Sequence, residues 1–204
     1  TKDSKYQVTS VVDGVESELS KEGKTLESNY FDIPINKPAD NTVQGEAYSY
    51  SAGDASVGDL DGDGEYEIVL KWDPSNAKDA AQAGYTGECI IDAYKQDGTQ
   101  LWRITMGPNI RSGAHDTQFL VYDFDGDGRD EVMAGYTMLD SDGTPQWSCH
   151  DLDDHCDALW VGNVKPECDG VQMVIGGSVT VLYDTNGKEI WRYSGSKESQ
   201  HVAL

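Results

Sequence analysis

The chain of 204 residues has few basic side chains, with 15 Lys and Arg against 37 Asp and Glu and a formal net charge of -22. Such a surface repels nucleic acid and anionic membranes and attracts divalent cations. No apolar run approaches the roughly 18 residues that a membrane-spanning helix needs, and residues 1–5 do not resemble a signal peptide. We therefore expect no nucleic acid and no membrane as a partner, and either a leader that has been removed or a start within a longer protein.

Motifs of several enzyme classes are also missing. The sequence holds no Gly-x-Ser-x-Gly, no Walker loop and no dinucleotide-binding fingerprint. Ester hydrolysis, nucleoside triphosphate chemistry and redox cofactors therefore have no support. Among the 37 acidic residues, no pair stands out as the two carboxylates of a glycoside hydrolase.

Two nine-residue acidic stretches, 59–67 and 123–131, are near copies of each other. The carboxylates at positions one, three, five and nine can converge on one hard cation if the backbone curls tightly, which the paired glycines permit. The seventh residue would contribute its carbonyl oxygen, so a basic side chain is tolerable there. We predict two calcium loops, with the ligands Asp59, Asp61, Asp63, Glu65 and Glu67 in the first and Asp123, Asp125, Asp127, Arg129 and Glu131 in the second.

Two alternatives to this interpretation are weaker. An EF-hand would place a Glu at position twelve, where these stretches have Leu70 and Ala134. A solvated acidic turn without a metal would leave four converging carboxylates to repel one another. Each stretch is preceded and followed by a short apolar run, so we expect each loop to join two strands.

The four cysteines form no Cys-x-x-Cys pair, which disfavours a soft-metal site. Calcium loops of modest affinity function best outside the cell, where calcium is millimolar and disulfides also persist. We therefore predict a secreted, extracellular protein. A disulfide between Cys149 and Cys156 would leave Cys89 with Cys168, but the sequence does not choose among the three pairings, and four buried thiols are the alternative.

A turn-and-tryptophan unit recurs at residues 97–102, 142–147 and 186–191. Each period reads as strand, loop, strand, strand, an Asp-Gly or Asn-Gly turn, and a last strand that ends in Trp. Four antiparallel strands in one period are typical of a β-propeller blade. We expect Trp102, Trp147 and Trp191 to pack between blades.

The repeat predicts an all-β chain built from β-propeller blades, about three and a fraction of them, at about 45–104, 115–148 and 155–193 with a stub at 200–204. A propeller ring needs at least four blades, so we expect either a fragment or association with other chains or copies. Upstream, 6–15 reads as a hairpin that turns at Asp13-Gly14, and 29–35 as a further short strand. We predict part of a small N-terminal β-domain at 1–44 and the blades at 45–204, with 75–82 as a candidate short helix.

An insertion, residues 71–87, interrupts the period of the first predicted blade. Loops on the faces of propellers are common ligand sites. The rings of Trp72 and Tyr85 could stack on sugars, and Asp73 and Asn76 could hydrogen-bond sugar hydroxyls. The alternative is an ordered loop that caps the sheet.

A second candidate segment covers residues 109–115. Arg111 can pair with a carboxylate, and His115 can transfer a proton or ligate a metal. Because His155 and His201 occupy the same phase of the repeat, we expect some of these histidines to be structural.

The stretch 53–76, GDASVGDLDGDGEYEIVLKWDPSN, resembles the bacterial rhamnogalacturonan lyases of polysaccharide lyase family 11, and further matching segments lie at 84–87, 91–95, 109–111 and 113–115. Residues 30–40 and 45–131 resemble the family closely and the rest loosely, with a departure after Glu131. The resemblance implies an eight-bladed, calcium-bearing propeller with an N-terminal β-domain, secreted to cut the alternating rhamnose and galacturonate backbone of pectin. This chain would be about a third of such a protein.

The resemblance also implies cleavage by β-elimination on an acidic polysaccharide. The proton beside a galacturonate carboxylate would be removed by Lys71 or His115, while calcium or Arg111 neutralises that carboxylate. Lys71 would have to be desolvated to lose its own proton near neutral pH. The rival hypothesis is a non-catalytic, calcium-stabilised module that binds carbohydrate or assembles with copies of itself.

Overall fold

The computed structural model describes residues 4–23, 25–26, 28–113, 115–149, 152, 155–168, 170–195, 199 and 201–203. The contacts divide the chain into two compact units, Thr1–Pro34 and Ile35–Leu204. All regular structure in these described residues is β, in sixteen strands, which confirms the predicted all-β class. No helix long and apolar enough to cross a membrane occurs among them.

The first unit contains the hairpin of β1 (Val11–Val12) and β2 (Val15–Glu16). Its turn lies at Asp13-Gly14, as predicted, and both residues have positive φ, 52° and 78°, as a type I′ hairpin turn requires. The strand predicted at 29–35 is wrong, because these residues pair with no described strand. Pro34 lacks the amide hydrogen that a strand ladder would use.

The second unit begins with the hairpin β3 (Asn41–Val43) and β4 (Glu46–Tyr48), so both sides of the predicted boundary at 44/45 lie in it. Three four-stranded antiparallel sheets follow, each with its strands in chain order. The first sheet contains β5 (Tyr50–Gly58), β6 (Glu67–Pro74), β7 (Ile90–Tyr94) and β8 (Gln100–Thr105). The second contains β9 (Phe119–Tyr122), β10 (Glu131–Ala134), β11 (Thr137–Leu139) and β12 (Pro145–Ser148). The third contains β13 (Ala158–Gly162), β14 (Gln172–Gly176), β15 (Thr180–Asp184) and β16 (Glu189–Tyr193).

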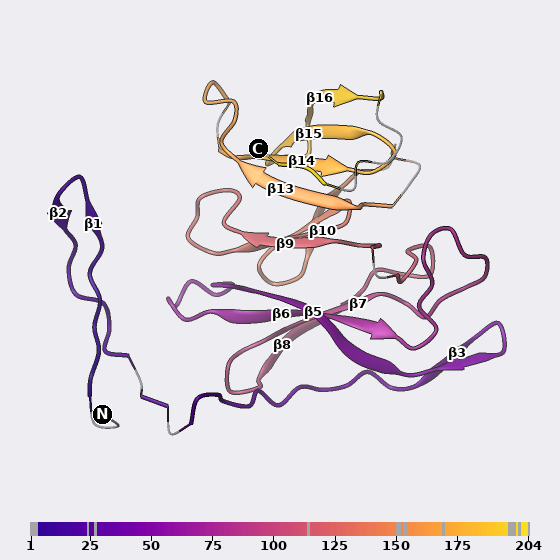
Figure 1. The fold of residues 1–204 in the computed structure, drawn as a ribbon, viewed down its shortest axis with the longest axis horizontal. Coiled ribbons are helices and arrows are strands. Elements are labelled where there is room, and N and C mark those ends of the chain that lie inside the picture. Colours follow the sequence, from indigo (N-terminus) through magenta and orange to yellow (C-terminus); the bar gives the residue numbers. More distant parts are fainter. Residues whose placement is uncertain are drawn as a thin grey trace. The chain divides into compact units, whose positions relative to one another are not determined.

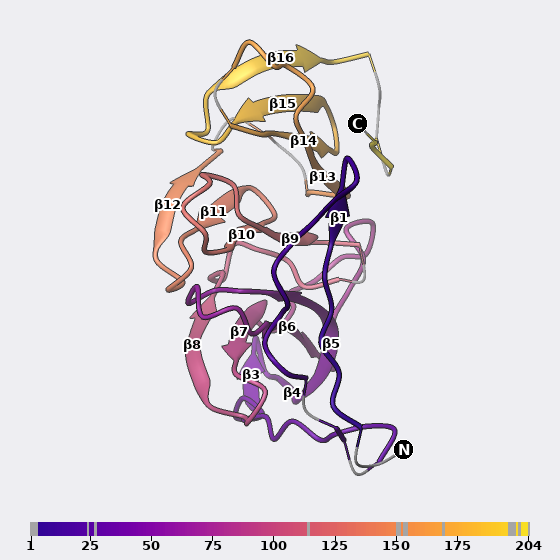
Figure 2. The same ribbon diagram turned by 90° about the vertical axis from the view of Figure 1, so that its left-hand side faces the viewer.

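The second sheet lies between the first and the third (Figures 1 and 2). The position of β10 in this middle sheet explains why residues 132–134 form a continuous apolar run. Val132 and Ala134 belong to the core shared with the first sheet, whereas Met133 belongs to the core shared with the third. Successive side chains of a strand point to opposite faces, so a sheet buried on both faces needs apolar residues at every position.

The repeated tryptophans link neighbouring sheets, as predicted for the first two. Trp102 of β8 donates its indole N–H to the carbonyl oxygen of Ser141 at 2.9 Å, and Trp147 of β12 donates to that of Thr185 at 3.0 Å. Gly187 lies flat against the Trp147 ring, where a Cβ atom would come within 2.5 Å of a ring carbon. Trp191 of the third sheet is 47% exposed instead.

Two predicted elements are absent from the second unit. Residues 75–82 form turns rather than a helix, because the bonds from Ala77 N to Pro74 O and from Gln82 N to Asp79 O each close only a single turn. Of the predicted stub 200–204, only 201–203 lie within the described residues, and they form no strand.

Candidate functional site

The loop between β5 and β6 curls around its own carboxylates. Asp59 accepts hydrogen bonds from the amides of Asp63 (3.0 Å) and Gly64 (2.8 Å), and the buried Glu67 accepts one from Leu60 at 2.9 Å. Gly62 and Gly64 have φ of 74° and 84°, which other residues rarely adopt. Carboxylate oxygens of Asp59, Asp61 and Glu67 consequently lie within 4.8 Å of one another.

The loop between β9 and β10 repeats this arrangement. Asp123 accepts from the amides of Gly126 (2.7 Å) and Gly128 (3.1 Å), and Glu131 accepts from Phe124 at 2.9 Å. In this loop the oxygens of Asp123, Asp125 and Asp127 lie within 4.8 Å of one another. The predicted carbonyl ligands, Glu65 and Arg129, donate their amides to Asp63 Oδ1 (2.8 Å) and Asp127 Oδ1 (2.9 Å).

The electrostatics of these two acidic loops fit a hard cation. Burial raises the pKa of Glu131 to about 7, with the neighbouring aspartates adding to the shift and the Phe124 amide opposing it. Burial also raises the pKa of Glu67. The buried Asp61 Oδ1 has no hydrogen-bond partner among the described residues. Carboxylate oxygens are the ligands that Ca²⁺ prefers, so both donor sets fit that ion.

The carboxylates of the first acidic loop pair with a lysine of a neighbouring turn, whereas among the described residues no ion pair involves the carboxylates of the second loop. The ammonium of Lys95 pairs with Asp61 Oδ2, lies 3.4 Å from Asp63 Oδ2 and 4.0 Å from Glu67 Oε1. Its hydrogen bond with Asp61 raises the pKa of Lys95. The corresponding turn position in the second sheet is occupied by Asp140, since Lys95 N bonds Thr99 O and Asp140 N bonds Thr144 O in the same way.

The two acidic loops contact each other, and the predicted ligand-binding segments lie at the other end of the strands. Asp59 N donates to Asp130 Oδ2 at 2.7 Å, and Asp130 N donates to Asp59 O at 2.9 Å. The insertion, now 75–89, follows the far end of β6, and residues 106–113 and 115–118 follow the far end of β8. Because strands alternate in direction, these connections are separated from the acidic loops by the length of a strand.

The structure joins the insertion to the Arg111 segment. Arg111 donates to the carbonyl oxygens of Gly84 (3.0 Å) and Asp79 (3.4 Å), and the Ser112 hydroxyl donates to Gly87 O at 3.0 Å. His115 Nδ1 lies 3.3 Å from Asp79 Oδ2, and the imidazole is exposed. The insertion and the Arg111 segment are therefore in direct contact.

Several predicted binding residues have structural roles instead. Trp72 is 2% exposed and donates its indole N–H to the buried Asp92 at 2.7 Å, so its ring is closed to a sugar and the stacking prediction is wrong. Lys71 is equally buried and lies 3.1 Å from Asp54 Oδ2. Both residues belong to β6, and because side chains alternate along a strand they point to opposite faces. The apolar run at residues 68–70, directly after the acidic loop, is the sequence signal that indicates this strand.

The remaining residues of the predicted binding set differ in exposure. Asn76 is buried and accepts the Gly87 amide at 2.8 Å, which stabilises the insertion. Asp73 is half-buried, and burial raises its pKa. Tyr85 is 61% exposed, so its ring is open to a ligand.

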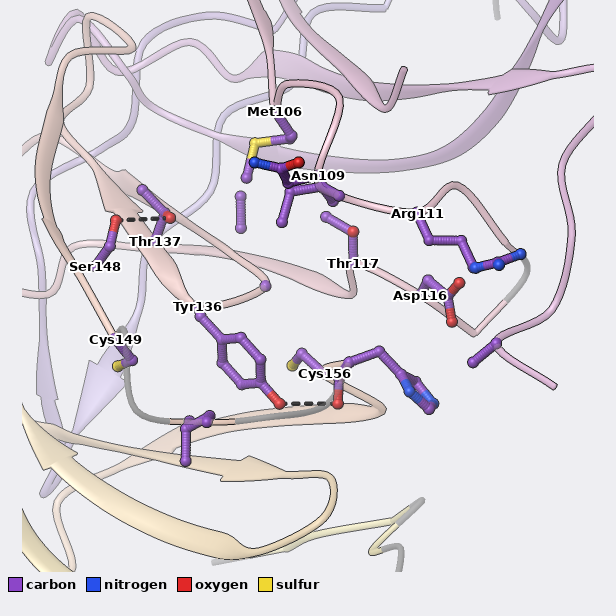
Figure 3. A pocket seen from close by; sticks show the side chains of 16 residues that line it. Met106, Asn109, Arg111, Asp116, Thr117, Tyr136, Thr137, Ser148, Cys149 and Cys156 are labelled. Atoms are coloured by element: carbon purple, nitrogen blue, oxygen red, sulfur yellow. Dashed lines mark hydrogen bonds between the residues drawn. The ribbon is translucent and has the colours of Figure 1, made fainter. Parts of the chain in front are cut away.

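A cavity of about 650 Å³ lies at this end of the second unit (Figure 3). Asp116 lines it, is 3% exposed, and neither carboxylate oxygen has a hydrogen-bond partner among the described residues. Burial raises the pKa of Asp116, and the charges of His155 and Arg111 oppose that shift. The hydroxyl of Tyr136 donates to His155 O at 2.8 Å, and those of Thr137 and Ser148 lie 2.9 Å apart. Asp116 was not among the residues predicted from the sequence, where the neighbouring His115 was chosen instead.

The histidines that share a phase of the repeat separate into two environments. His115 and His201 line a second cavity of about 420 Å³ together with Asp157. His155 Nε2 lies 2.8 Å from Asp157 Oδ1, a contact next to the start of the third sheet. This pairing fits the expectation that some of these histidines are structural.

The cysteines are all in the thiol form, so the structure gives no support to the predicted disulfides. Burial raises the pKa of Cys89 to about 11 and that of Cys156 to about 12. At such values the thiols remain protonated at neutral pH and behave as small apolar side chains.

Comparison with known proteins identifies the family. The model of the rhamnogalacturonan lyase family 11, C-terminal domain, matches residues 30–134, just over half of the chain. The chain belongs to rhamnogalacturonan lyase family 11. This confirms the resemblance carried by the first acidic loop and the insertion.

Relatives within family 11 match most of the chain. The rhamnogalacturonan endolyase YesW of Bacillus subtilis (strain 168) is 57% identical over 191 residues, 92% of this chain and 29% of YesW. The rhamnogalacturonan exolyase YesX of the same organism is 56% identical over 155 residues, 76% of this chain and 25% of YesX. The chain thus spans between a quarter and a third of the length of these curated relatives.

Solved structures of family 11 lyases superpose on nearly the whole chain. The exotype rhamnogalacturonan lyase YesX gives a TM-score of 0.77 with 36% identity, over 98% of this chain and 42% of that structure. The Bacillus licheniformis rhamnogalacturonan lyase PL11 gives 0.76 with 36% identity, over 98% and 43%.

Proposed function

We propose that the chain is a segment of a secreted, calcium-dependent protein that cleaves the rhamnose–galacturonate backbone of pectin by β-elimination. Family membership supports the substrate class. The observation that carries the proposal for this segment is the contact between the insertion and the Arg111 segment, which together border a cavity at one end of the sheets. The three meander sheets would be blades of a propeller, completed by further segments or chains.

In β-elimination a base removes the proton on C5 of galacturonate, beside the carboxylate. The electron pair forms the C4–C5 double bond, the C4–O bond breaks, and the departing rhamnose oxygen takes up a proton. His115 is our candidate base, because its imidazole is exposed and held by Asp79 at 3.3 Å. Lys71 suits this role poorly, since its buried ammonium is paired with Asp54 and has no lone pair to offer.

Arg111 contributes charge and position in this proposal. Its guanidinium stays cationic while it donates to two carbonyl oxygens of the insertion, so it would attract a galacturonate carboxylate towards this face. The same bonds hold Tyr85, whose exposed ring would stack on a sugar, within the ordered insertion.

Calcium would be held by the two acidic loops, through Asp59, Asp61 and Glu67 in one and Asp123, Asp125 and Asp127 in the other. When bound, the ions would neutralise clustered carboxylates. The loops lie a strand length away from His115, so we propose a structural role for both ions. The turn glycines set the curl of each loop, and this curl positions the carboxylates that would hold the ion.

A non-catalytic carbohydrate-binding module is the second candidate. Lys71 is paired with Asp54, and Arg111 donates to backbone carbonyls. Of the two predicted bases this leaves only the exposed His115, which favours a module that binds without catalysis. Such a module would bind the polymer without changing it.

The ultraviolet absorbance of the reaction product separates these functions, since elimination creates a double bond conjugated to a carboxylate and hydrolysis does not. The intact protein that contains this chain should produce that absorbance on rhamnogalacturonan, and His115→Ala should lower the rate at least tenfold with calcium still bound. Tyr66→Ala, an exposed change at the acidic-loop end, serves as the control. Polymer binding without new absorbance would remove the lyase function and leave the binding module.

A further inference from the structure

We propose that the cavity beside Asp116 binds the neutral rhamnose residue of the polymer, with the Asp116 carboxylate accepting hydrogen bonds from the sugar hydroxyls. The inference deepens the proposed function, on which it rests, by assigning one sugar of the backbone to one place on the chain. The site for the neutral sugar is distinct from the roles proposed above for His115 as the base and Arg111 as the group that attracts a carboxylate.

The first reason is the state of Asp116. A buried carboxylate is costly unless hydrogen bonds compensate the lost hydration. Asp116 is 3% exposed, lines the cavity, and has no partner for either oxygen among the described residues. Figure 3 places it at the edge of the cavity below Arg111. Two vicinal hydroxyls of a pyranose would supply the donors that the described part of the chain does not.

The second reason concerns charge, which separates rhamnose from galacturonate. Arg111 and His155 also line the cavity, but neither is hydrogen-bonded to Asp116: Arg111 donates to two carbonyl oxygens of the insertion, and His155 Nε2 lies 2.8 Å from Asp157 Oδ1. Asp79 and Asp157 add negative charge around the cavity. A galacturonate carboxylate placed against Asp116 would bring two carboxylates together, whereas a neutral sugar would not, so the galacturonate that Arg111 attracts to this face would lie next to the rhamnose and away from Asp116.

The third reason is the shape and polarity of the walls. Met106, Ile110 and Leu152 supply apolar surface, which suits the methyl group of a 6-deoxy sugar. The hydroxyl pair of Thr137 and Ser148 supplies further donors and acceptors on another wall. A cavity of about 650 Å³ with mostly apolar walls and a few convergent polar groups has the usual character of a small-molecule site.

A metal ion suits the cavity less well. A hard cation such as Ca²⁺ gathers about six to eight oxygen ligands. Among the described residues, the groups of three ligand atoms within 4.8 Å are those of the two acidic loops, and Asp116 belongs to neither. Asp116 is the one carboxylate among the described residues that line the cavity, and one carboxylate does not make a calcium site.

The test measures the binding of two monosaccharide probes to the 204-residue chain in calcium buffer by saturation-transfer NMR. The probes are methyl α-L-rhamnopyranoside and methyl α-D-galactopyranosiduronate. We expect saturable binding of the rhamnoside and at least tenfold weaker binding of the galacturonoside. Asp116→Asn should weaken the rhamnoside about tenfold, because a charge-assisted hydrogen bond becomes a neutral one. Asp116→Ala should abolish its binding.

Two controls keep a structural effect apart from a binding effect. Asp32→Asn removes the same charge at an exposed position of the first unit and should leave rhamnoside binding unchanged. The melting temperature of Asp116→Asn should equal or exceed that of the unmodified chain, because an uncompensated buried charge is removed.

Three results would overturn the inference: no saturable rhamnoside binding by the unmodified chain, binding that survives Asp116→Ala, or loss of one bound calcium ion from Asp116→Asn in equilibrium dialysis. The last would make the cavity a cation site. None of these readouts depends on elimination, so failure of the lyase proposal in the absorbance assay leaves the test intact. Rhamnoside binding with no elimination would support a sugar site in a non-catalytic module.

Discussion

Gly187→Ala tests the joint between the second and third sheets. Gly187 has φ of +75°, and an added Cβ would lie 2.5 Å from Cδ2 and 2.7 Å from Cε3 of Trp147. The ring has little freedom to retreat, because its N–H bonds Thr185 O at 3.0 Å and it packs against Tyr183 with ring centroids 6.1 Å apart.

Two costs add in this variant. An Ala in the left-handed region costs roughly 1–2 kcal/mol. Forcing a methyl group into a packed contact costs typically about 1–3 kcal/mol more. Gly45→Ala is the matched control, since Gly45 has φ of +84° in the same unit with nothing within 4 Å of its added Cβ. The difference between the two variants isolates the contact with Trp147.

Urea denaturation followed by circular dichroism measures the difference in the free energy of unfolding. We expect Gly187→Ala to be less stable than Gly45→Ala by about 2 kcal/mol, which corresponds to roughly 4–8 °C in melting temperature. In a Trp147→Leu background the extra cost should disappear. Equal destabilisation by the two glycine variants would refute the inference that the ring and the turn are packed without slack.

Further predictions concern the acidic loops and the buried polar groups. Chelation of calcium should lower the melting temperature, and calorimetry that shows one unchanged transition in excess EDTA would contradict a structural ion. Lys95→Met should lower the melting temperature in EDTA further, because the carboxylates of the first loop then lack the lysine that pairs with them. An equal melting temperature for the variant and the unmodified chain in EDTA would contradict that role. In EDTA, stability should fall as pH rises from about 5 to 8, because the pKa of Glu131 is raised to about 7 in the folded state and the proton is lost there; Glu131→Gln should flatten this dependence in thermal melts. Trp72→Phe should cost about 1–3 kcal/mol in urea unfolding, since the fully buried Asp92 loses a donor, and a neutral outcome would mean that Asp92 finds a replacement. Tyr85→Ala should leave stability unchanged and weaken polymer binding in affinity electrophoresis, and unchanged binding would exclude the ring from the site.

Local chemistry explains the elements that were predictable. The curl of each acidic loop is set within nine residues, by glycines at positive φ and by aspartates that accept amides three to five positions ahead. The turn-and-tryptophan period similarly depends on near neighbours, such as Asp97, Asp142 and Asp184, which accept amides within their own turns. Such signals survive in sequence because the interacting groups are fixed to one another by the chain.

The errors arose where partners are distant in sequence. Residues 29–35 have strand-like composition, but a strand forms only where another strand offers its backbone, and none of the described strands pairs with them. Trp72 has the ring of a sugar platform, but strand alternation turned it towards Asp92, twenty residues away. Exposure is decided by what packs on each face, and composition does not record that.

The sequence by itself determined the all-β class, the three periods, the two acidic loops and the family, because each depends on spacing along the chain. Only the tertiary structure decided that Arg111 holds the insertion through Gly84, that Lys95 pairs with the first acidic loop, and that Asp116 is buried beside a cavity with no hydrogen-bond partner among the described residues. These are contacts across 27 and 34 residues, or a contact that is missing. The side chain determines which charge a residue can have, but whether that charge is compensated depends on groups that only the fold brings close to it.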